Sequence, residues 1–221
     1  MRITGGDLSG RKILAPSGLL TRPAPDILRV ALFNILKNRL KGSVVLDLFA
    51  GTGILSFDSL SRGASFAVLV ENSRAALEKI KQNADKLNLK DKVQVINYDV
   101  FKIIPVLRHL YRSFSVVFID PPYALLQDPE MRLKLFDLIR SLYNESNLLT
   151  EDAVTMLRYS KGDSCAEEMS DSFQVLRRRS YGTTEFALLA RKGLRIVLGT
   201  KHPFDRKEKR KQKKNRKEEE N

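Results

Sequence analysis

Cysteine, histidine and tryptophan are the scarcest residues of this 221-residue chain. It contains one cysteine, Cys165, two histidines, His109 and His202, and no tryptophan. A single cysteine excludes a disulfide framework within the chain, and so few thiol and imidazole groups cannot build a Cys/His zinc cluster. We therefore expect no metal site.

Long apolar runs are also missing. No segment approaches the roughly 20 apolar residues that a membrane-spanning helix needs. The first six residues, Met-Arg-Ile-Thr-Gly-Gly, show no apolar signal-peptide stretch. The chain is expected to be cytoplasmic and to have no membrane segment.

Acidic residues are outnumbered by basic ones, 26 to 39, which gives a formal net charge of +13. The segment from Lys201 onward holds 10 Lys/Arg and 5 Asp/Glu, so residues 1–200 keep 29 basic and 21 acidic residues. The excess is therefore not confined to the end of the chain. A basic body favours a polyanionic partner, of which nucleic acid is the obvious candidate.

Glycine, proline and charge divide the chain into three predicted parts. Residues 1–24 combine Gly, Arg and Pro with short apolar pieces, which is typical of a small β-hairpin followed by a loop. The main domain is expected over residues 25–195, and residues 196–221 are expected to form a basic, mobile tail. Pro25-Asp26 predicts the start of the first helix, whose exposed face would carry Arg29, Lys37 and Arg39.

Short apolar strands alternate with amphipathic helices through the main domain. Strands are expected at 44–48, 66–70, 93–97, 116–119 and 153–159, and helices at 54–62, 73–87, 100–110 and 130–143. This alternation predicts an α/β fold with a largely parallel sheet covered on both faces. Two further strands at 173–179 and 185–191 predict an antiparallel edge.

The first strand runs into a glycine-rich turn, Asp47-Leu48-Phe49-Ala50-Gly51-Thr52-Gly53. Ligands of open α/β sheets bind at the carboxyl ends of strands, where glycines let the backbone approach closely. A dinucleotide fingerprint would need glycine at Ser56, and Asp47 would repel a pyrophosphate, so a hydride-transfer enzyme is disfavoured. A carboxylate here suits a cationic ligand such as S-adenosylmethionine, which carries a sulfonium and an ammonium group.

Two more acidic residues follow successive strands. Glu71 is placed to accept hydrogen bonds from ribose hydroxyls, and Asp99 is placed to accept one from an adenine amino group. Acids at three successive strand ends would open onto one edge of the sheet. The predicted cofactor-binding residues are Asp47, Phe49, Ala50, Gly51, Gly53, Glu71, Asn72, Asp99 and Val100.

A fourth strand ends in Asp120-Pro121-Pro122-Tyr123, which we call the catalytic corner. The two prolines restrict the backbone, so the Asp120 carboxylate and the Pro121 carbonyl can face the cleft as rigid acceptors. Hydrogen bonds to these acceptors would aim the lone pair of an exocyclic amine at a sulfonium methyl group, and Tyr123 would stack on the base. The predicted catalytic residues are Asp120, Pro121 and Tyr123. This motif alone leaves guanine, adenine and some glutamines open as acceptors.

Several signatures beyond this corner resemble the RsmD family of bacterial methyltransferases, which methylate guanine N2 in small-subunit 16S ribosomal RNA. They cover residues 2–191 and comprise Ile3-Thr4-Gly5-Gly6, Gly10-Arg11-Lys12, Thr21-Arg22-Pro23, Arg29 with Leu32-Phe33-Asn34, the glycine turn, Ser61-Arg62-Gly63-Ala64, Asp120-Pro121-Pro122-Tyr123 and Tyr181-Gly182-Thr183-Thr184. The chain departs from the family at Ile27 and Val30, where Arg and Glu are usual, and in its basic tail.

The resemblance implies a Rossmann-like, seven-stranded class I methyltransferase sheet and an N-terminal hairpin that contacts RNA through Arg11, Lys12, Arg22 and Arg29. It implies transfer of a methyl group from S-adenosylmethionine to guanine N2 of 16S ribosomal RNA within a partly assembled small subunit, by a monomer. Two alternatives are an adenine-N6 methyltransferase acting on DNA or RNA, and a non-catalytic RNA-binding assembly factor that has the same fold.

Overall fold

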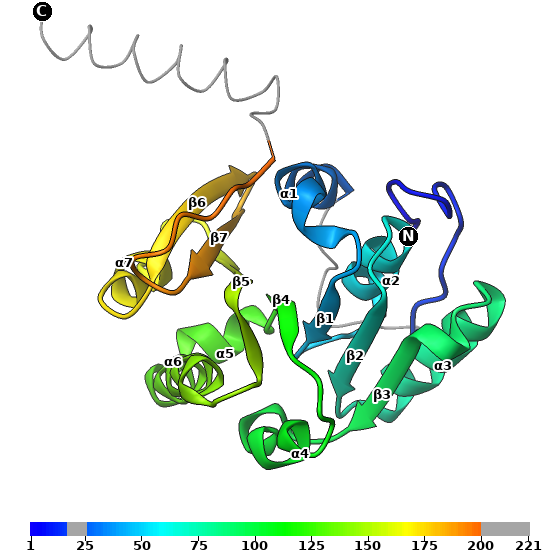
Figure 1. The fold of residues 1–221 in the computed structure, drawn as a ribbon. Helices are drawn as coiled ribbons and strands as arrows, with labels where there is room; N and C mark the ends of the chain where they lie inside the picture. The colour runs from blue at the N-terminus through cyan, green and yellow to red at the C-terminus, as the bar shows by residue number, and fades with distance from the viewer. Residues whose placement is uncertain (17–25, 200–221) are drawn as a thin grey trace, which may run out of the picture.

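The computed structural model describes residues 1–16 and 26–199, and within these ranges the strands form one seven-stranded sheet. The strands are β1 (Val44–Asp47), β2 (Phe66–Glu71), β3 (Val93–Asn97), β4 (Phe114–Ile119), β5 (Leu149–Ser160), β6 (Gln174–Tyr181) and β7 (Thr184–Ala190). Their order across the sheet is β3-β2-β1-β4-β5-β7-β6 (Figure 1). Strands β1 to β5 pair in parallel, and β7 pairs antiparallel with both β5 and β6. The predicted fold class and its antiparallel edge are confirmed.

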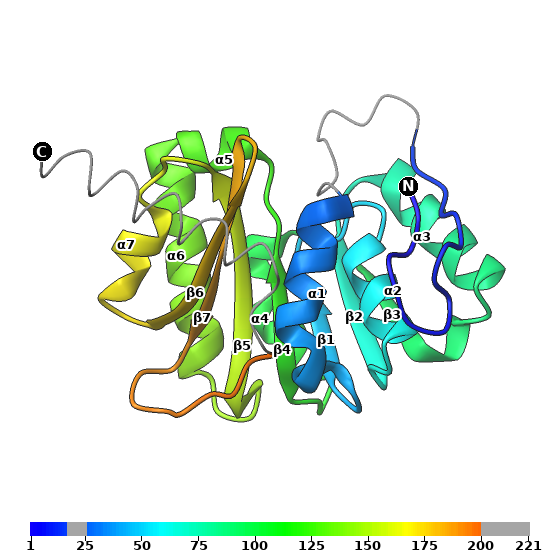
Figure 2. The same ribbon diagram turned by 90° about the horizontal axis from the view of Figure 1, so that it is seen from above.

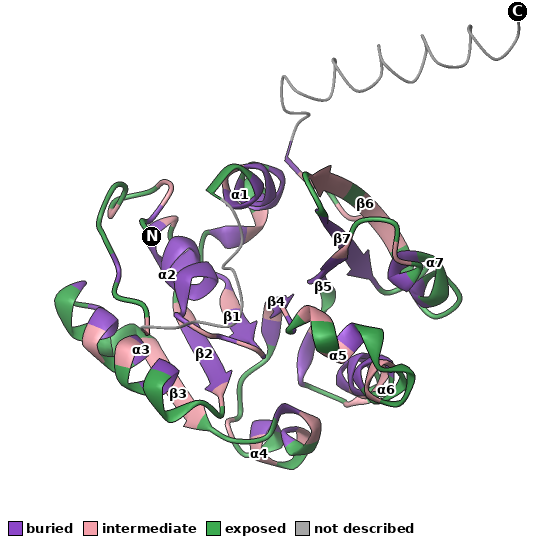
Figure 3. Ribbon diagram, turned by 180° about the vertical axis from the view of Figure 1, so that it is seen from behind, coloured by how far each residue is buried: buried purple, intermediate pink, exposed green. Residues whose placement is uncertain are grey.

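Helices cover both faces of the sheet (Figure 2). They are α1 (Asp26–Leu40), α2 (Ile54–Ser61), α3 (Arg74–Lys86), α4 (Ile104–Arg108), α5 (Tyr123–Gln127), α6 (Pro129–Asn144) and α7 (Cys165–Ser170), with short 3-10 turns η1 (Lys90–Lys92) and η2 (Val100–Lys102). Side chains of α1, α2 and α3 share one apolar core with Val45 of β1, and those of α4 to α7 share the other with Leu46. Successive strand residues point to opposite faces, so strands buried on both sides read as continuous apolar runs (Figure 3).

Local signals explain where two of the longer helices begin. The Ser73 hydroxyl accepts a hydrogen bond from the Ala76 amide at the start of α3, and the Asp128 carboxylate caps α6, whose first residue is Pro129. The helix predicted over 100–110 is instead η2 followed by α4. Pro105 explains the break, because it has no amide hydrogen to continue a helix and is tolerated only in a first turn.

The predicted N-terminal hairpin is present as a loop closed by one antiparallel bridge between Arg2 and Lys12. The Ile3 amide donates to the Arg11 carbonyl, and the Ile13 amide donates to the Met1 carbonyl. Ile3 and Ile13 are buried in the core on the α1–α3 side. The hairpin therefore packs on the body of the protein and lies alongside α2 (Figures 1 and 2). The predicted boundary between residues 24 and 25 falls outside the described residues.

The strand order places a ligand site between β1 and β4. Chain connections run outward in opposite directions from these two neighbours, to β2 and β3 on one side and to β5 on the other. Such a reversal opens a crevice at the carboxyl ends of the strands, where open α/β sheets bind their ligands. In the part of the chain that the structure describes, no helix is both long and apolar enough to cross a membrane.

Candidate functional site

Three of the predicted acids lie at or just beyond the carboxyl ends of β1, β2 and β4, which are neighbours in the sheet. Asp47 is the last residue of β1, Glu71 is the last residue of β2, and Asp120 follows β4 directly. In the sheet, Asp47 pairs in register with Leu69 of β2 and with Phe118 of β4, so Glu71 and Asp120 each lie two residues beyond the level of Asp47 on the neighbouring strands. Asp120 and Glu71 both act electrostatically on Asp47.

The glycine turn between β1 and α2 requires its two glycines. Gly51 and Gly53 have φ angles of 54° and 76°, in the left-handed region that favours glycine. A Cβ atom at Gly53 would lie 2.7 Å from the ring of Phe57 and 3.0 Å from Leu69. The turn is also tied to β2, because the Ala50 amide donates to the Val70 carbonyl at 3.1 Å.

Asp47 is a buried carboxyl group that lacks a full set of partners. Its side chain accepts a 2.8 Å hydrogen bond from the Ser56 hydroxyl through Oδ2, while Oδ1 is buried and has no partner among the described residues. Burial raises the pKa of Asp47 to about 7, and the nearby Asp120 and Glu71 add to the rise, against the Ser56 hydrogen bond. A ligand that brings a positive charge would satisfy this group.

Glu71 and Asp99 already accept hydrogen bonds from the backbone around them. The Glu71 carboxylate accepts from the amides of Gly51 at 2.7 Å, Asn72 at 3.0 Å and Ser73 at 2.8 Å. Asp99 accepts from the Phe101 amide at 3.0 Å and so caps η2. An ionised carboxylate offers about four acceptor positions, so neither side chain is saturated. Both acids are held rigidly while retaining acceptor capacity for a ligand.

Side chains of mixed character line the edge beside these acids. The half-buried Phe49 ring meets the half-buried Phe101 ring edge to face, with centroids 6.4 Å apart. Val100 is buried and Asn72 is exposed. Apolar rings, backbone-anchored carboxylates and an unsatisfied acid together fit a ligand that combines an adenine ring, ribose hydroxyls and an ammonium group, as S-adenosylmethionine does.

The catalytic corner links β4 to α5. Pro121 is buried, Pro122 caps α5, and Tyr123 is the first residue of that helix. The Asp120 side chain is 14% exposed and accepts a hydrogen bond from Nε of Arg158 on β5. Burial raises the pKa of Asp120, and the Arg158 cation opposes that rise. Asp120 is therefore a desolvated acceptor with a paired positive charge.

Tyr123 is held from two sides. Its hydroxyl shares a 2.5 Å hydrogen bond with Oγ1 of Thr184, the first residue of β7. The guanidinium carbon of Arg158 lies 5.4 Å from the centroid of the tyrosine ring, within cation–π range. Because β7 runs antiparallel to β5, its start lies at the same edge of the sheet as the strand ends that carry the acids.

Sequence patterns did not identify four residues of this region: Ser56, Phe101, Arg158 and Thr184. A usable signal existed for Arg158, because it is a charged residue within the otherwise apolar strand 153–159, and buried charges need a partner. Ser56 and Thr184 lie within the recognised motifs, but a hydroxyl shows no periodicity that would reveal its partner. Phe101 resembles any core aromatic residue.

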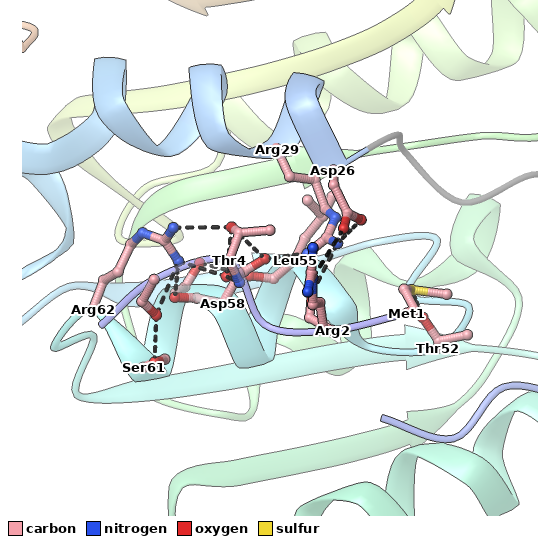
Figure 4. Close-up of polar contacts among 12 residues, drawn as sticks. Met1, Arg2, Thr4, Asp26, Arg29, Thr52, Leu55, Asp58, Ser61 and Arg62 are labelled. Carbon is pink, nitrogen blue, oxygen red and sulfur yellow. Dashed lines mark hydrogen bonds and ion pairs between the residues drawn. The ribbon is translucent and has the colours of Figure 1, made fainter. Parts of the chain in front are cut away.

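The structure corrects the predicted exposure of Arg29. This residue was expected on the exposed face of α1 as an RNA-binding residue, but its side chain is completely buried. Its guanidinium pairs with Asp58 of α2 and Asp26, and also donates to the Arg2 carbonyl at 2.9 Å (Figure 4). Arg29 thus joins the hairpin to α1 and α2, and is not placed to meet RNA phosphates. Of its predicted neighbours on that face, Lys37 is exposed and Arg39 is half-buried against Asp152.

The Asp58 carboxylate lies at the centre of these contacts between the hairpin, α1 and α2. It also accepts from the amide of Thr4 at 2.8 Å and from the Arg62 guanidinium at 2.5 Å (Figure 4). Ser61 adds a further link, because its hydroxyl donates to the Gly5 carbonyl at 2.6 Å. These contacts fix the hairpin to the C-terminal half of α2.

The remaining predicted RNA-binding residues differ in what the structure describes. Arg11 and Lys12 are exposed on the hairpin, whereas Arg22 lies outside the described residues. The open end of the hairpin is beside the glycine turn, since Oγ1 of Thr52 lies 3.6 Å from Sδ of Met1. Among residues 1–16 and 26–199, no three His, Cys, Asp or Glu side chains are grouped to hold a metal ion.

Comparisons with known proteins agree with this architecture. A family model described as "Conserved hypothetical protein 95" matches residues 1–190. The chain is 30% identical over 193 residues to the "Putative rRNA methyltransferase YlbH" of Bacillus subtilis, covering 87% of this chain and 100% of that protein. It is 34% identical over 123 residues to "Ribosomal RNA small subunit methyltransferase D" of Escherichia coli, covering 56% of this chain and 60% of that protein.

Solved structures of methyltransferases also share this fold. The structure of the "Putative methyltransferase yhhF from Escherichia coli" superposes with a TM-score of 0.69 at 26% identity, covering 88% of this chain and 99% of that one. The fold is also that of "A putative sam-dependent methyltransferase from Streptococcus mutans", which superposes with a TM-score of 0.63 at 17% identity, covering 78% of this chain and 50% of that one. Because the family model spans most of the chain, from the hairpin to the end of β7, this protein belongs to the Conserved hypothetical protein 95 family, the RsmD-type family of methyltransferases.

Proposed function

We propose that this protein transfers a methyl group from S-adenosylmethionine to the exocyclic N2 of a guanine in small-subunit 16S ribosomal RNA. The observation that carries the proposal is the catalytic corner, where Asp120 and Pro121 directly follow β4 and Asp120 lies near the incompletely hydrogen-bonded carboxyl group of Asp47. Relatives named as ribosomal RNA small subunit methyltransferases support the choice of substrate.

The residues at the ends of β1 to β3 hold the cofactor in this proposal. Asp47 accepts the ammonium group, Glu71 the ribose hydroxyls and Asp99 the adenine amino group. Phe49, Ala50, Gly51 and Gly53 shape the turn that passes beneath it, with Asn72 and Val100 at the sides. S-adenosylmethionine supplies an electrophilic methyl group on its sulfonium sulfur.

The corner prepares the amine for attack. An exocyclic amine is a weak nucleophile while its lone pair is delocalised into the base. Hydrogen bonds from its two N–H groups to the Asp120 carboxylate and the Pro121 carbonyl would let the nitrogen become pyramidal and hold its lone pair in line with the methyl group. Tyr123 stacks on the base and limits its rotation, and Asp120 or water takes the proton after transfer.

The exposed cations of the hairpin provide the RNA contact. Arg11 and Lys12 lie on a loop that Asp58 and Arg29 fix to the body, and the open end of this loop reaches the glycine turn. Phosphate contacts position a nucleic acid without reading its sequence, so these residues would orient the RNA while the corner receives the base. The protein is proposed to act as a monomer on a partly assembled small subunit.

Methyl transfer to isolated small subunits tests the proposal. Small subunits from bacterial cells that lack their own enzyme would be incubated with the protein and labelled cofactor, and the nucleosides then separated by mass spectrometry. Label in N2-methylguanosine is expected, and Asp120→Ala should abolish it while leaving RNA binding nearly intact. Label in N6-methyladenosine would redirect the proposal to an adenine-N6 enzyme, and no label with intact RNA binding would favour a non-catalytic assembly factor.

A further inference from the structure

Arg158 is the one charged residue in the buried stretch 153–159 of β5. Its residue is 5% exposed, and β5 pairs with β4 on one side and β7 on the other. The β4–β5 register aligns Ile119 with Leu157, so Arg158 lies beside Asp120, and its Nε donates to that carboxylate. A buried ion pair adds little stability compared with apolar residues of the same volume. Stability alone therefore gives no reason for this pair.

The pair touches the second functional side chain of the corner as well. The guanidinium carbon of Arg158 lies 5.4 Å from the ring centroid of Tyr123. On the far side of β5, the buried Thr184 of β7 shares a 2.5 Å hydrogen bond with the Tyr123 hydroxyl. Both side chains that would meet the base are thus held by residues of the neighbouring strands β5 and β7.

The charges facing Asp120 show what Arg158 opposes. From β1, Asp47 interacts unfavourably with Asp120, and burial of Asp120 itself favours its protonated form. From α5 the neighbour is the uncharged Tyr123, and from β5 it is Arg158, the cation that favours the ionised form. A protonated carboxyl group has an O–H donor and less acceptor capacity. Asp120, which accepts one amine hydrogen while the Pro121 carbonyl accepts the other, therefore has its full acceptor capacity only when it is ionised.

We propose that Arg158 is a positioning residue that keeps Asp120 as an ionised, fixed acceptor. Thr184 is likewise a positioning residue, which holds the Tyr123 ring in place. This inference rests on the proposed function, because it assigns Asp120 the amine and Tyr123 the base. The opposite role for the same interaction is a block, in which Arg158 occupies the Asp120 carboxylate and must move away before the base can bind. The two roles make opposite predictions for the rate when Arg158 is removed.

The first test follows ionisation without requiring activity. Carbon-13 carboxylate NMR of Asp120 would be recorded against pH in the wild-type protein, Arg158→Gln and Arg158→Lys. The Asp120 titration is expected to move to higher pH in Arg158→Gln and to stay near the wild-type position in Arg158→Lys. An unchanged titration in Arg158→Gln would overturn the proposal, whether or not the protein methylates guanine. Absence of guanine methylation by the wild-type protein would instead count against the proposed function.

The second test measures methyl transfer against pH with saturating cofactor. In Arg158→Gln the acid limb of kcat/KM should shift upward, with a decrease of about tenfold at low pH for each pKa unit of the shift and recovery at high pH. Arg158→Lys should restore much of the rate. A faster Arg158→Gln enzyme would show that Arg158 blocks the Asp120 carboxylate, and would overturn its proposed positioning role. Arg39→Gln is the matched control, because Arg39 pairs with Asp152 near the opposite end of the same strand and should leave the profile unchanged.

A third variant, at Thr184, tests the proposal even if the Arg158 variants fail to fold. Thr184→Val removes the hydrogen bond to Tyr123 and keeps every charge in place. It is expected to raise KM for the RNA several-fold, to leave the acid limb unmoved, and to be rescued by Thr184→Ser. Equal KM values for wild-type and Thr184→Val would overturn the role assigned to Thr184. A shifted acid limb in Thr184→Val would show that the limb does not report on Arg158, and would likewise count against the proposal.

Discussion

Asp47 has a buried oxygen atom without a partner among the described residues. Its pKa of about 7 follows mainly from that burial, so in the ligand-free protein the carboxyl group gains its charge only near neutrality. An ammonium ligand would favour the charged form and release a proton on binding. The affinity of the cofactor site should therefore depend on pH.

Binding of S-adenosylhomocysteine, which keeps the ammonium group, tests this dependence. Affinity is expected to rise with pH from about 5 to about 7 and then level off, because below pH 7 the ligand must first displace a proton from Asp47. The slope would approach about tenfold per pH unit. Isothermal titration calorimetry at several pH values measures it, and Asp47→Asn should give weaker and nearly pH-independent binding. A flat wild-type profile would contradict the role of Asp47.

Gly53 gives a prediction about packing as well as backbone conformation. Gly53→Ala should destabilise the protein by about 1–3 kcal/mol, because the φ angle of 76° is unfavourable for alanine and the new methyl group would meet Phe57. Gly42→Ala is the matched control, since Gly42 has a φ of 75° with open space around it. Urea denaturation of both variants separates the two effects. Equal destabilisation would mean that Phe57 moves aside at no cost.

The positions of candidate site residues were predictable where a strand end fixes a direction. Asp47, Glu71 and Asp120 each follow an apolar run, and parallel strands bring such ends to one edge. The partners of these residues were not predictable, because Arg158 reaches Asp120 only through the β4–β5 register, and Thr184 reaches Tyr123 only through the antiparallel return of β7.

The N-terminal hairpin depends on a buried ionic cluster for its attachment. Asp58 and Arg29 both have fully buried side chains, and Asp58 also binds the Thr4 amide. Removing Arg29 takes the buried cation away from Asp58 and leaves that carboxylate only the Arg62 guanidinium, and breaking a buried ion pair typically costs about 3–5 kcal/mol. The cost should be felt first where the hairpin meets α2.

Arg29→Met tests the attachment. It should lower the free energy of unfolding by about 3–5 kcal/mol and make residues 1–16 more sensitive to proteolysis, because Asp58 would no longer face its buried cation. Urea denaturation and limited proteolysis measure the two effects. Lys134→Met, which breaks the exposed Lys134–Glu130 pair within α6, should change stability by less than about 0.5 kcal/mol. Similar destabilisation in both variants would argue against the cluster as an anchor.

At the level of elements, long and periodic segments were predicted well and short ones were not. Helix α6 has a capping aspartate, an initial proline and a full apolar face, and its predicted bounds were close. Helices α5 and α7 span five and six residues, too few for a period of 3.6 to be visible. The predicted exposed face of α1 was partly wrong. Arg29 was assumed to be exposed, because the sequence does not show that Asp58 lies opposite it in the fold.

Across the whole molecule, the hairpin and helix α6 lie on opposite faces of the sheet (Figure 2). If RNA contacts Arg11 and Lys12, the variant Arg11→Gln/Lys12→Gln should weaken RNA binding and reduce the slope of log K against log salt by about 0.7–0.9 for each phosphate that is no longer neutralised. Filter binding at several salt concentrations measures this slope. Lys134→Gln/Arg140→Gln removes the same charge from α6 and should leave the slope unchanged. An equal effect of both pairs would indicate attraction by net charge alone.

The fold class was predictable because alternation of apolar strands with amphipathic helices has few solutions, and right-handed parallel crossovers cover both faces of a sheet. The strand order was not predicted, since hydrophobic patterns do not say which strands are neighbours. The insertion of β7 between β5 and β6 is such a feature.

That insertion affects the order in which the protein becomes functional during its synthesis. Domains can begin to fold as they emerge from the ribosome, N-terminal part first. The strands that would bind the cofactor, β1 to β4, are complete by Ile119, yet β5 lacks its outer neighbour and Tyr123 lacks its hydrogen-bond partner until β7 is translated. A nascent chain that ends before Thr184 would therefore present a cofactor site without a finished base site. The last strand to be made thus delays a competent catalytic corner until the protein is nearly whole.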